Sequence, residues 1–402
     1  MRVVFLTMSN LQEVGSSGIY SDLMRMFRNE GHEVYIVSPR ERRTGERNHL
    51  YESEGVHFLA VRTLNLQKTN IIEKGIGQVL VEGQFNRAIS KYLGQVNFDL
   101  ILYSTPPITF PKVIKKLKRN HPQAKTYLLL KDIFPQNAVD LGMMRKNGLK
   151  GILYRFFRKK ETELYSLSDY IGCMSPANVQ YIKEHNPEIQ TEKLELAPNS
   201  YERVASEQLS DVECLAIREK YHLPIDKPVF IYGGNLGKPQ GIPFLIQCLN
   251  ANANREDCYF VVIGDGTEYN KMESWYKTCK PKSVSVFQRL PKVEYDKLVR
   301  ACDVGLIFLD YRFTIPNYPS RLLPYLMEKK PIIAATDPNS DIGTIAEANG
   351  YGFYCPSNSI EAFTMTVNKM INSDIHAMGE AGYRFYLDHY TIEHTYNAIV
   401  SH

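Results

Sequence analysis

Paired cysteines, long hydrophobic runs and tryptophan are scarce in this sequence, which has one tryptophan in 402 residues. Its seven cysteines are scattered, without a Cys-x-x-Cys spacing or histidines at zinc-ligand spacing, so neither a disulfide framework nor a structural metal site is expected. No stretch reaches the roughly 18 consecutive apolar residues of a membrane-spanning helix. The start, MRVVFLTMSN, turns polar where a secretory signal would stay hydrophobic. We expect a cytoplasmic protein that does not cross a membrane.

Two nucleotide-binding fingerprints are also absent. No GxGxxG motif occurs, and the predicted strand that ends near Ser38 carries no acidic residue to bind a ribose hydroxyl. The GxxxxGK[ST] loop of P-loop nucleotide hydrolases is missing as well. Nicotinamide-dependent dehydrogenases and P-loop enzymes are therefore disfavoured.

The composition is that of an ordinary folded protein, with 44% hydrophobic and 23% charged residues. The length exceeds that of one hydrophobic core, so two domains of about 200 residues are expected. The net charge of +4 is unevenly distributed, because residues 111–160 contain fourteen Lys and Arg but only two Asp. This segment is strongly basic, and the rest of the chain is acidic.

One pattern of elements occurs twice. Residues 2–8 read as a buried strand, 9–18 as a loop, 19–30 as an amphipathic helix and 33–37 as a second strand. Residues 228–264 repeat this order as strand PVFIY, loop GGNLGKPQ, helix GIPFLIQCLN and strand CYFVVIG. Short apolar strands alternate with helical segments in both halves. The sequence therefore predicts two Rossmann-like α/β domains, each with a doubly wound parallel sheet.

The loop GGNLGKPQG at 233–241 is the most informative candidate site. Ligands of open α/β sheets bind beyond the carboxyl ends of the strands. Glycines let backbone amides approach an anion, the N-terminus of the following helix adds a favourable partial charge, and Lys238 adds a full one. The loop predicts a diphosphate site, and the alternative is a tight strand-to-helix turn without a ligand.

A second candidate lies in NYPSRLLPYL at 317–326, which reads as a loop, an N-cap at Ser320 and a helix with Arg321 in its first turn. Pro324 keeps the helix start close, because proline is tolerated only around the first turn. Free amides and Arg321 would form a second anion site, the other half of one diphosphate clamp. The alternative is a capped surface helix with a solvated arginine.

The order of the motifs resembles a known family. GGNLGKPQG, VIGDG, FQRLP, NYPSRLLPYL, KKPIIAATD and GYGF are similar to the donor domain of the family 4 glycosyltransferases of bacterial surface-polysaccharide assembly. GSSGIY and KDIFPQNAVDLG resemble the acceptor half, particularly of transferases of N-acetylated amino-deoxyhexoses such as N-acetylfucosamine. The resemblance covers nearly the whole chain and implies the GT-B fold, with two Rossmann-like domains that face each other across a cleft.

The resemblance also implies an acceptor domain at 1–204, a donor domain at 205–378 and a helix at 379–402 that packs back on the first domain. It implies retaining transfer of a sugar from a nucleotide sugar, expected to be a UDP sugar, without a metal or other cofactor. Lys238 and Arg321 would act at the diphosphate. Judged singly, Arg289 is as readily a surface cation and Asp265 a turn residue. The donor-binding positions it implies are Gly18, Gly234, Asn235, Gly237, Gln240, Gly264, Asp265, Gly266, Arg289, Leu290, Pro291, Pro319, Ser320 and Leu322.

Four positions depart from the family pattern. Many members carry two glutamates eight positions apart, where this chain has Pro316 and Pro324, so the carboxylate that usually binds the ribose is missing. The Arg and Lys common in the phosphate loop are replaced by Asn235 and Gln240. These changes affect the expected recognition of the donor but not the resemblance in fold.

On the acceptor side, Asp132 follows an apolar strand at 126–130. A carboxylate at the carboxyl end of a strand can take a proton from an acceptor hydroxyl or orient it. Asp132 is therefore the third catalytic candidate. The alternative is that it caps a helix or pairs with Lys131.

Residues 142–160, GMMRKNGLKGILYRFFRKK, interleave cations with apolar and aromatic residues. This pattern is typical of an amphipathic helix at an anionic lipid surface, and the alternative is a solvated helix whose apolar face meets the core. Nucleic acid is not expected as a partner, because no recognition motif accompanies the charge. The predicted membrane-facing residues are Arg145, Lys146, Arg155, Phe156, Phe157, Arg158 and Lys159.

Three functions are compatible with these features. The leading hypothesis is a glycosyltransferase, peripheral at the inner face of the bacterial membrane, that moves a sugar from a nucleotide sugar to a lipid-linked oligosaccharide. The second is a UDP-sugar 2-epimerase on the same fold. The third is a non-catalytic partner that binds a nucleotide sugar beside an active transferase.

Overall fold

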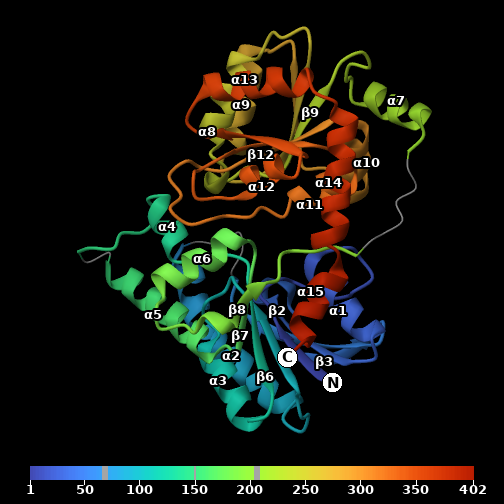
Figure 1. The fold of residues 1–402 in the computed structure, drawn as a ribbon. Coiled ribbons are helices and arrows are strands. Elements are labelled where there is room, and N and C mark those ends of the chain that lie inside the picture. The colour runs from blue at the N-terminus through green and yellow to red at the C-terminus, as the bar shows by residue number, and fades with distance from the viewer. Residues whose placement is uncertain (66–70, 149–150, 203–208) are drawn as a thin grey trace. The chain divides into compact units, whose positions relative to one another are not determined.

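The computed structural model describes residues 1–65, 71–148, 151–202 and 209–402 (Figure 1). The chain divides into two compact units. Unit 1 comprises Met1–Arg203 and Thr391–His402, and unit 2 comprises Val204–Tyr390. Each unit has its own sheet with helices packed on it, so the predicted pair of α/β domains with doubly wound, mainly parallel sheets is confirmed.

The described part of unit 1 has an eight-stranded sheet in the order β3-β4-β2-β1-β5-β6-β7-β8. Neighbouring strands are parallel, except in the β3–β4 hairpin at one edge. Glu54 and Gly55 form the two-residue loop of this hairpin and both have positive φ, which is typical of the turn that joins twisted antiparallel strands. The strands are β1 (Arg2–Leu6), β2 (Glu33–Glu41), β3 (His49–Ser53), β4 (Val56–Thr63), β5 (Leu100–Ser104), β6 (Lys125–Leu130), β7 (Tyr170–Cys173) and β8 (Leu194–Leu196).

The central strands of this sheet are buried over most of their length, because helices cover both faces. All five residues of β5, LILYS, are buried, as expected for a parallel strand between two helical layers. Short 3-10 turns η1 (Arg42–Thr44) and η2 (Thr191–Lys193) join the larger elements. The helices of unit 1 are α1 (Ile19–Asn29), α2 (Ile71–Tyr92), α3 (Pro111–Asn120), α4 (Gln136–Asp140), α5 (Gly151–Leu167), α6 (Pro176–His185) and α15 (Ile392–Val400).

The C-terminal segment at 379–402 is divided between two helices instead of forming one. Helix α14 (Ile375–His389) belongs to unit 2, and α15 belongs to unit 1, where it lies beside α1 in Figure 1. The chain is extended at Thr391, and the Ile392 N–H donates to the Tyr201 carbonyl at 3.1 Å. The Tyr396 ring lies 4.9 Å from the Phe27 ring on α1. The part that packs on unit 1 therefore begins at Thr391, twelve positions later than expected.

Unit 2 repeats the same architecture with a six-stranded parallel sheet, in the order β11-β10-β9-β12-β13-β14. The predicted second repeat corresponds to β9, α8 and β10. Its strands are β9 (Val229–Asn235), β10 (Tyr259–Asp265), β11 (Val284–Gln288), β12 (Val304–Phe308), β13 (Ile332–Thr336) and β14 (Gly352–Pro356). Its helices are α7 (Asp211–Lys220), α8 (Ile242–Ala251), α9 (Tyr269–Cys279), α10 (Lys292–Ala301), α11 (Leu322–Met327), α12 (Ile342–Ala348), α13 (Ile360–Ile371) and α14, with a 3-10 turn η3 (Lys238–Gln240) before α8.

Candidate functional site

The carboxyl edge of the unit 2 sheet brings the predicted donor loops together. The chain runs from β9 outward to β10 and β11, then returns to β12 on the other side of β9. Loops that leave such a switch point in opposite directions leave a crevice in which ligands bind. The loop 233–241 follows β9, and the Asp310 N–H, which comes after β12, donates to the Pro239 carbonyl at 2.9 Å. The predicted diphosphate loop therefore lies at the switch point.

Glycines allow the loops after β9 and β10 to pack without side chains between them. A Cβ atom at Gly264 would lie 1.9 Å from the Gly234 carbonyl oxygen, and one at Gly266 would lie 2.5 Å from the Leu236 carbonyl oxygen. Gly234 also has a φ of +116°, which L residues rarely adopt. The Leu236 N–H donates to the Asp265 carbonyl at 3.0 Å. Backbone atoms therefore form this part of the edge.

Within the loop, Gln240 has a structural role. Its side-chain oxygen accepts a hydrogen bond from the Asn235 amide at 3.2 Å and from the Gly237 N–H at 3.3 Å, which closes η3. Asn235 and Lys238 are exposed at the edge. Of the predicted phosphate-loop side chains, these two can reach a ligand directly, whereas the Gln240 oxygen already has two donors.

Arg321 carries a buried, unpaired donor at this edge. Its guanidinium carbon lies 4.5 Å from the centre of the Tyr232 ring, a cation–π distance. The same carbon lies 3.8 Å from the point that a Cβ atom on Gly234 would occupy. Its Nη1 is buried and has no hydrogen-bond partner among the described residues. Because an unpaired buried donor is costly, and charged donors bind phosphate oxygens strongly, this nitrogen suits an anionic ligand.

Tyrosines border the Arg321 guanidinium. The Tyr325 hydroxyl donates to the Ile231 carbonyl at 3.1 Å and accepts from the Gly233 N–H at 3.2 Å. Burial raises the pKa of Tyr295 to about 12, although the Arg321 charge opposes that rise. These phenols are therefore neutral near pH 7, and they position the Arg321 cation without neutralising it.

The helix after the NYPSR segment starts later than predicted. Ser320 does not cap it; the residue before α11 is Arg321, which is in a helical conformation and makes no side-chain cap. The Leu322 N–H donates to the Pro319 carbonyl at 3.2 Å, and the Leu323 N–H donates to the Ser320 carbonyl at 3.1 Å. Two amides of the predicted helix start, those of Leu322 and Leu323, are therefore already bonded. An anion here would bind the Arg321 side chain instead of a helix N-terminus.

Asp337, which the sequence did not single out, anchors the loop before α11. It is fully buried at the end of β13, and its carboxylate accepts from the Ser340 hydroxyl at 2.8 Å and the Asn339 N–H at 2.9 Å. The Ser340 hydroxyl in turn accepts from the Asn317 N–H at 3.0 Å. Burial raises the pKa of Asp337 to about 6. The signal was the DPNS sequence directly after a strand, where an Asp side chain bonds the following backbone.

The remaining predicted donor positions in unit 2 lie at strand ends on the same edge. Asp265 ends β10, and its carboxylate accepts from the Gly266 N–H at 2.8 Å, which is the turn role considered as its alternative. Arg289 is exposed just after β11, and Pro291 occupies the cap position of α10. At the two positions where the family glutamates are absent, Pro316 is buried and Pro324 is partly exposed. The predicted donor positions Leu290 and Pro319 are also partly exposed.

Gly18 lies in the loop between β1 and α1 of unit 1. Its N–H donates to the Asp22 carboxylate at 3.0 Å, and the same carboxylate pairs with the Arg25 guanidinium at 2.8 Å. Asp22 is 1% exposed. The N–H of this predicted donor-binding residue is thus already bonded within its own unit.

Asp132 lies two residues after β6, at the carboxyl edge of the unit 1 sheet. Its two carboxylate oxygens accept from the Asn137 amide at 2.8 and 2.9 Å, and its N–H donates to the Thr105 hydroxyl at 3.3 Å. Burial raises the pKa of Asp132 to about 6. A carboxylate of this kind is oriented by its partner and changes protonation near neutral pH, as a general base requires.

The structure does not show either alternative for Asp132. Helix α4 begins at Gln136 without a side-chain cap, and the Lys131 ammonium donates to the Ala197 carbonyl at 2.8 Å. Two other titratable side chains near Asp132, those of Lys131 and Glu161, also have shifted pKa values. Burial lowers the pKa of Lys131 to about 7, and burial, reinforced by the Asp132 charge, raises the pKa of Glu161 on α5 to about 7. Glu161 could not be singled out from sequence patterns, because only packing brings α5 near this strand end.

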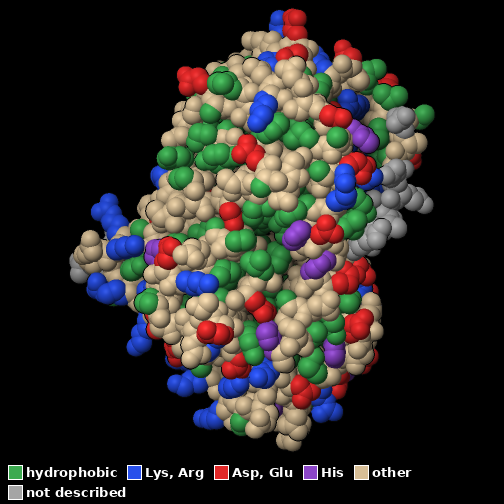
Figure 2. Space-filling view, viewed as in Figure 1, with side chains coloured by type: hydrophobic (Ala, Val, Ile, Leu, Met, Phe, Trp, Pro, Cys, Tyr) green, Lys and Arg blue, Asp and Glu red, His purple; other side chains and the backbone are tan. Residues whose placement is uncertain are grey.

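The basic segment presents a mixed surface of cations and apolar side chains. Met143, Ile152, Leu153 and Phe156 are 43% to 57% exposed. Figure 2 shows Lys and Arg side chains gathered over the α4–α5 loop and along α5. Leu149 and Lys150 lie outside the described residues. The exposed cations of this surface are Arg145, Lys146, Arg155 and Lys159.

Two predicted members of that surface face the fold instead. Phe157 is 9% exposed and its ring lies 5.1 Å from the Phe134 ring, while Arg158 pairs with the Glu161 carboxylate at 2.7 Å. Positions one helical turn apart share a face, so 157, 158 and 161 point inward together. In the part of the chain that the structure describes, no helix is long and apolar enough to span a bilayer, and no three His, Cys, Asp or Glu side chains are arranged to hold a metal ion.

Comparison with known proteins finds similar sequences and similar folds. Residues 215–385, within unit 2, match the family described as "Glycosyl transferases group 1". The chain is 24% identical over 335 residues to the probable glycosyltransferase WbjE of Pseudomonas aeruginosa, covering 78% of this chain and 75% of WbjE. It is 22% identical over 178 residues to the putative colanic acid biosynthesis glycosyl transferase WcaI of Escherichia coli K12, covering 43% of each.

Among solved structures, Anabaena HepE in complex with UDP and glucose is similar at a TM-score of 0.71, with 13% identity, covering 100% of this chain and 98% of HepE. At 13% identity this structural likeness establishes the fold alone. The family match concerns residues 215–385, in the second half of the chain. The chain therefore has the two-domain GT-B fold, and residues 215–385 are similar to the group 1 glycosyl transferases.

Proposed function

We propose that this protein transfers a sugar from a nucleotide sugar, specifically a UDP sugar, to a hydroxyl group of a lipid-linked glycan during synthesis of a bacterial surface polysaccharide. The observation that carries the proposal is the unpaired, buried Nη1 of Arg321 beside Gly234 at the switch point of the unit 2 sheet. The UDP bound to HepE supports the choice of nucleotide, and the name of WcaI supports a polysaccharide product.

The chemistry that this arrangement supports is stabilisation of a departing diphosphate. During transfer, the bond between the anomeric carbon and the β-phosphate oxygen breaks, and negative charge builds on that oxygen while the acceptor oxygen bonds to the anomeric carbon. Arg321 and Lys238 would stabilise this charge, and the Asn235 amide would donate to a phosphate oxygen. In this proposal two side-chain cations act without a metal ion, and the anomeric configuration is retained.

Unit 1 would bind the acceptor. As the acceptor oxygen attacks, Asp132 takes its proton, and Asn137 keeps the carboxylate in one orientation. With a pKa of about 6, Asp132 is mostly ionised at pH 7 and available as a base.

A thermal-shift panel of UDP, GDP, ADP, dTDP and CMP tests the donor assignment. A ligand that binds only the folded state at about 100 times its Kd adds about 2.7 kcal/mol to the free energy of unfolding. We therefore expect UDP to raise the Tm by several degrees and the other nucleotides to raise it less. Stabilisation by a different nucleotide would change the donor class, and no stabilisation by any of them would contradict nucleotide-sugar binding.

The prolines at 316 and 324 favour one competing function, a partner that binds the nucleotide sugar without turning it over. UDP release from a UDP sugar separates the possibilities. Transfer predicts release that depends on a lipid-linked acceptor, whereas release with the donor alone indicates epimerase chemistry. Binding of UDP without release under either condition would identify the non-catalytic partner.

We also propose that the mixed surface on the α4–α5 loop and α5 binds an anionic membrane. Each cation near such a membrane contributes about 1 kcal/mol, so a double change of Arg145→Gln and Arg155→Gln is expected to weaken binding about thirtyfold. Co-sedimentation with vesicles of phosphatidylserine and phosphatidylcholine measures this. A matched double change of the exposed Lys277→Gln and Lys280→Gln in unit 2 should bind as the wild type does. Equal loss in both variants would contradict a specific surface.

A further inference from the structure

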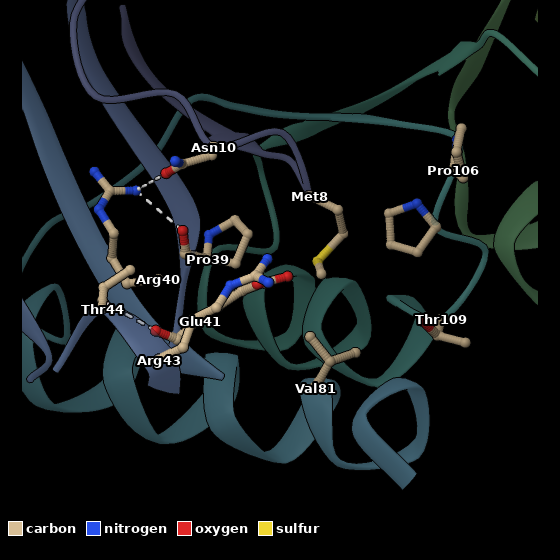
Figure 3. A pocket seen from close by; sticks show the side chains of 11 residues that line it. Met8, Asn10, Pro39, Arg40, Glu41, Arg43, Thr44, Val81, Pro106 and Thr109 are labelled. Atoms are coloured by element: carbon tan, nitrogen blue, oxygen red, sulfur yellow. Dashed lines mark hydrogen bonds and ion pairs between the residues drawn. The ribbon is translucent and has the colours of Figure 1, made fainter. Parts of the chain in front are cut away.

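Unit 1 contains a cavity that the roles above do not use. It lies at the carboxyl ends of β1, β2 and β5, with Val81 of α2 on one side, and its volume is about 270 Å³ (Figure 3). Pockets for drug-sized molecules usually measure about 300–1,000 Å³, and this one lies just below that range. Its size therefore suits a single sugar ring and not an oligosaccharide.

At the polar end of the cavity, each of the two lining arginines is paired with a carboxylate of the same unit. The Arg40 guanidinium is 2% exposed, donates to the Asn10 side-chain oxygen at 2.8 Å and lies 3.5 Å from the Glu46 carboxylate. Arg43 pairs with Glu41. Because each of these two arginines already has a carboxylate partner, the described residues that line this end offer no free cation to a phosphate or a uronic acid. It offers hydrogen-bonding groups to a neutral ligand.

The other end of the cavity is apolar except for one hydroxyl group. Figure 3 shows Met8, Val81, Pro106 and Thr109 at this end, away from the Arg40 side chain. Thr109 is 5% exposed, and its Oγ1 is buried without a hydrogen-bond partner among the described residues. A buried hydroxyl without a partner is unfavourable, so a ligand that reaches this end should bring both apolar surface and a polar atom. An acetamido group has both, as a methyl group and an amide.

The wall of the cavity is connected to the proposed base. Thr105, which precedes Pro106, accepts hydrogen bonds through its hydroxyl from the Lys131 N–H at 3.0 Å and the Asp132 N–H at 3.3 Å. These bonds join the loop after β5 to the loop after β6, and the two strands are neighbours in the sheet. A ring in the cavity would therefore lie next to the loop that carries Asp132.

We propose that this cavity binds one neutral sugar ring of the acceptor and that the ring carries an acetamido group. The amide would hydrogen-bond to the Thr109 hydroxyl, the methyl group would contact Met8 and Val81, and ring hydroxyls would face Asn10. That the sugar belongs to the acceptor rests on the proposed function, whereas its binding here rests on the cavity alone.

The test measures binding of methyl N-acetylglucosaminide, methyl glucoside and methyl glucuronide by NMR titration of the full chain. We expect the acetamido glycoside to bind most tightly, and Thr109→Val to weaken its binding about three- to tenfold and remove its advantage over methyl glucoside. Thr63→Val is the matched control, because Thr63 is also buried with an unpartnered hydroxyl but does not line the cavity. Val81→Phe, which fills the cavity, should abolish glycoside binding.

Three results would overturn the assignment: no glycoside binding by the wild type, unchanged binding by Thr109→Val or Val81→Phe, or tighter binding of the glucuronide than of the acetamido glycoside. UDP binding by each variant separates this inference from the proposed function. If UDP binds and the glycoside pattern fails, the cavity assignment alone is wrong. If the glycoside pattern holds and UDP binds no variant, the cavity binds a sugar and the donor assignment is wrong.

Discussion

Changing Arg321 to methionine is expected to lower kcat/KM for the nucleotide sugar by about a hundred- to a thousandfold, with the Tm unchanged or raised. The loss follows from removing a fixed cation where charge develops on the diphosphate, an effect of this size when a single stabilising group is deleted. The Tm should not fall, because removing a buried donor that has no partner among the described residues offsets the loss of the cation–π contact with Tyr232. Steady-state kinetics and thermal unfolding of the same preparation measure both quantities.

Arg218→Met is the matched control, since Arg218 lies in the same unit but its donors are in use. Its guanidinium bonds the Ala301 carbonyl at 2.8 Å and pairs with Asp303 at 2.7 Å. This variant should lose stability, by about 1–3 kcal/mol for a stranded buried partner, and keep wild-type kinetic constants. If Arg321→Met lowers the Tm and spares kcat/KM, as expected of Arg218→Met, then Arg321 is a structural arginine and the donor site lies elsewhere.

Changing Asp132 to asparagine is expected to lower kcat for transfer by about a hundred- to ten-thousandfold while leaving UDP binding unchanged. In the wild type, kcat/KM should fall about tenfold for each pH unit below about 6, because protonation removes the base. The residual activity of Asp132→Asn should lack this acid limb. Transfer rates measured from pH 5 to pH 8, with UDP binding measured at each pH, test the assignment.

Asp337→Asn supplies the control for the pH dependence, because Asp337 is a second buried aspartate whose pKa lies at about 6, but in the other unit. The acid limb should persist in that variant. If it disappears there and remains in Asp132→Asn, the titrating base is not Asp132.

Stability should respond to Asp132 in the opposite direction from activity. Its folded pKa of about 6 exceeds the ordinary value of 3.8, so the folded state binds the proton more tightly between these pH values. The contribution of Asp132 to the free energy of unfolding therefore falls as pH rises from about 4 to 6 and is most unfavourable above pH 6. Urea unfolding at pH 7 should show Asp132→Asn to be at least as stable as the wild type, and a large loss of stability would indicate that the carboxylate is structural.

The order of strands and helices could be predicted from the sequence, because the burial of each residue produces a local pattern of apolar and polar residues. Continuous apolar runs such as LILYS predicted strands buried on both faces, and the repeated order at 2–37 and 228–264 predicted the two units. The β3–β4 hairpin was missed, since its strands are short and its turn depends on positive φ at Glu54 and Gly55. The resemblance implied one helix at 379–402, whereas the backbone becomes extended at Thr391 and divides the segment between two helices.

The parts of the candidate site in which glycine and proline determine the backbone conformation could be predicted. The parts that depend on contacts between distant segments were harder to predict. The loop at 233–241 and Arg321 were singled out, and the structure places them side by side. The prediction that Ser320 caps this helix was wrong, because the Pro319 and Ser320 carbonyls accept from the Leu322 and Leu323 amides at the start of α11. Asp337 and Glu161 were missed, since their protonation depends on burial by segments distant in the sequence.

The sequence by itself determined the class of fold and the two-unit organisation, and it singled out the loop at 233–241 as an anion-site candidate, because these follow from local patterns of apolar residues, glycine and charge. Only the tertiary structure decided which side chains remain available to a ligand. Gly18 and Gln240 are bonded within the fold, whereas Arg321 and Thr109 each keep a buried polar atom without a partner among the described residues. The physical reason is that hydrogen-bond satisfaction is settled by packing between distant segments, which no local pattern records.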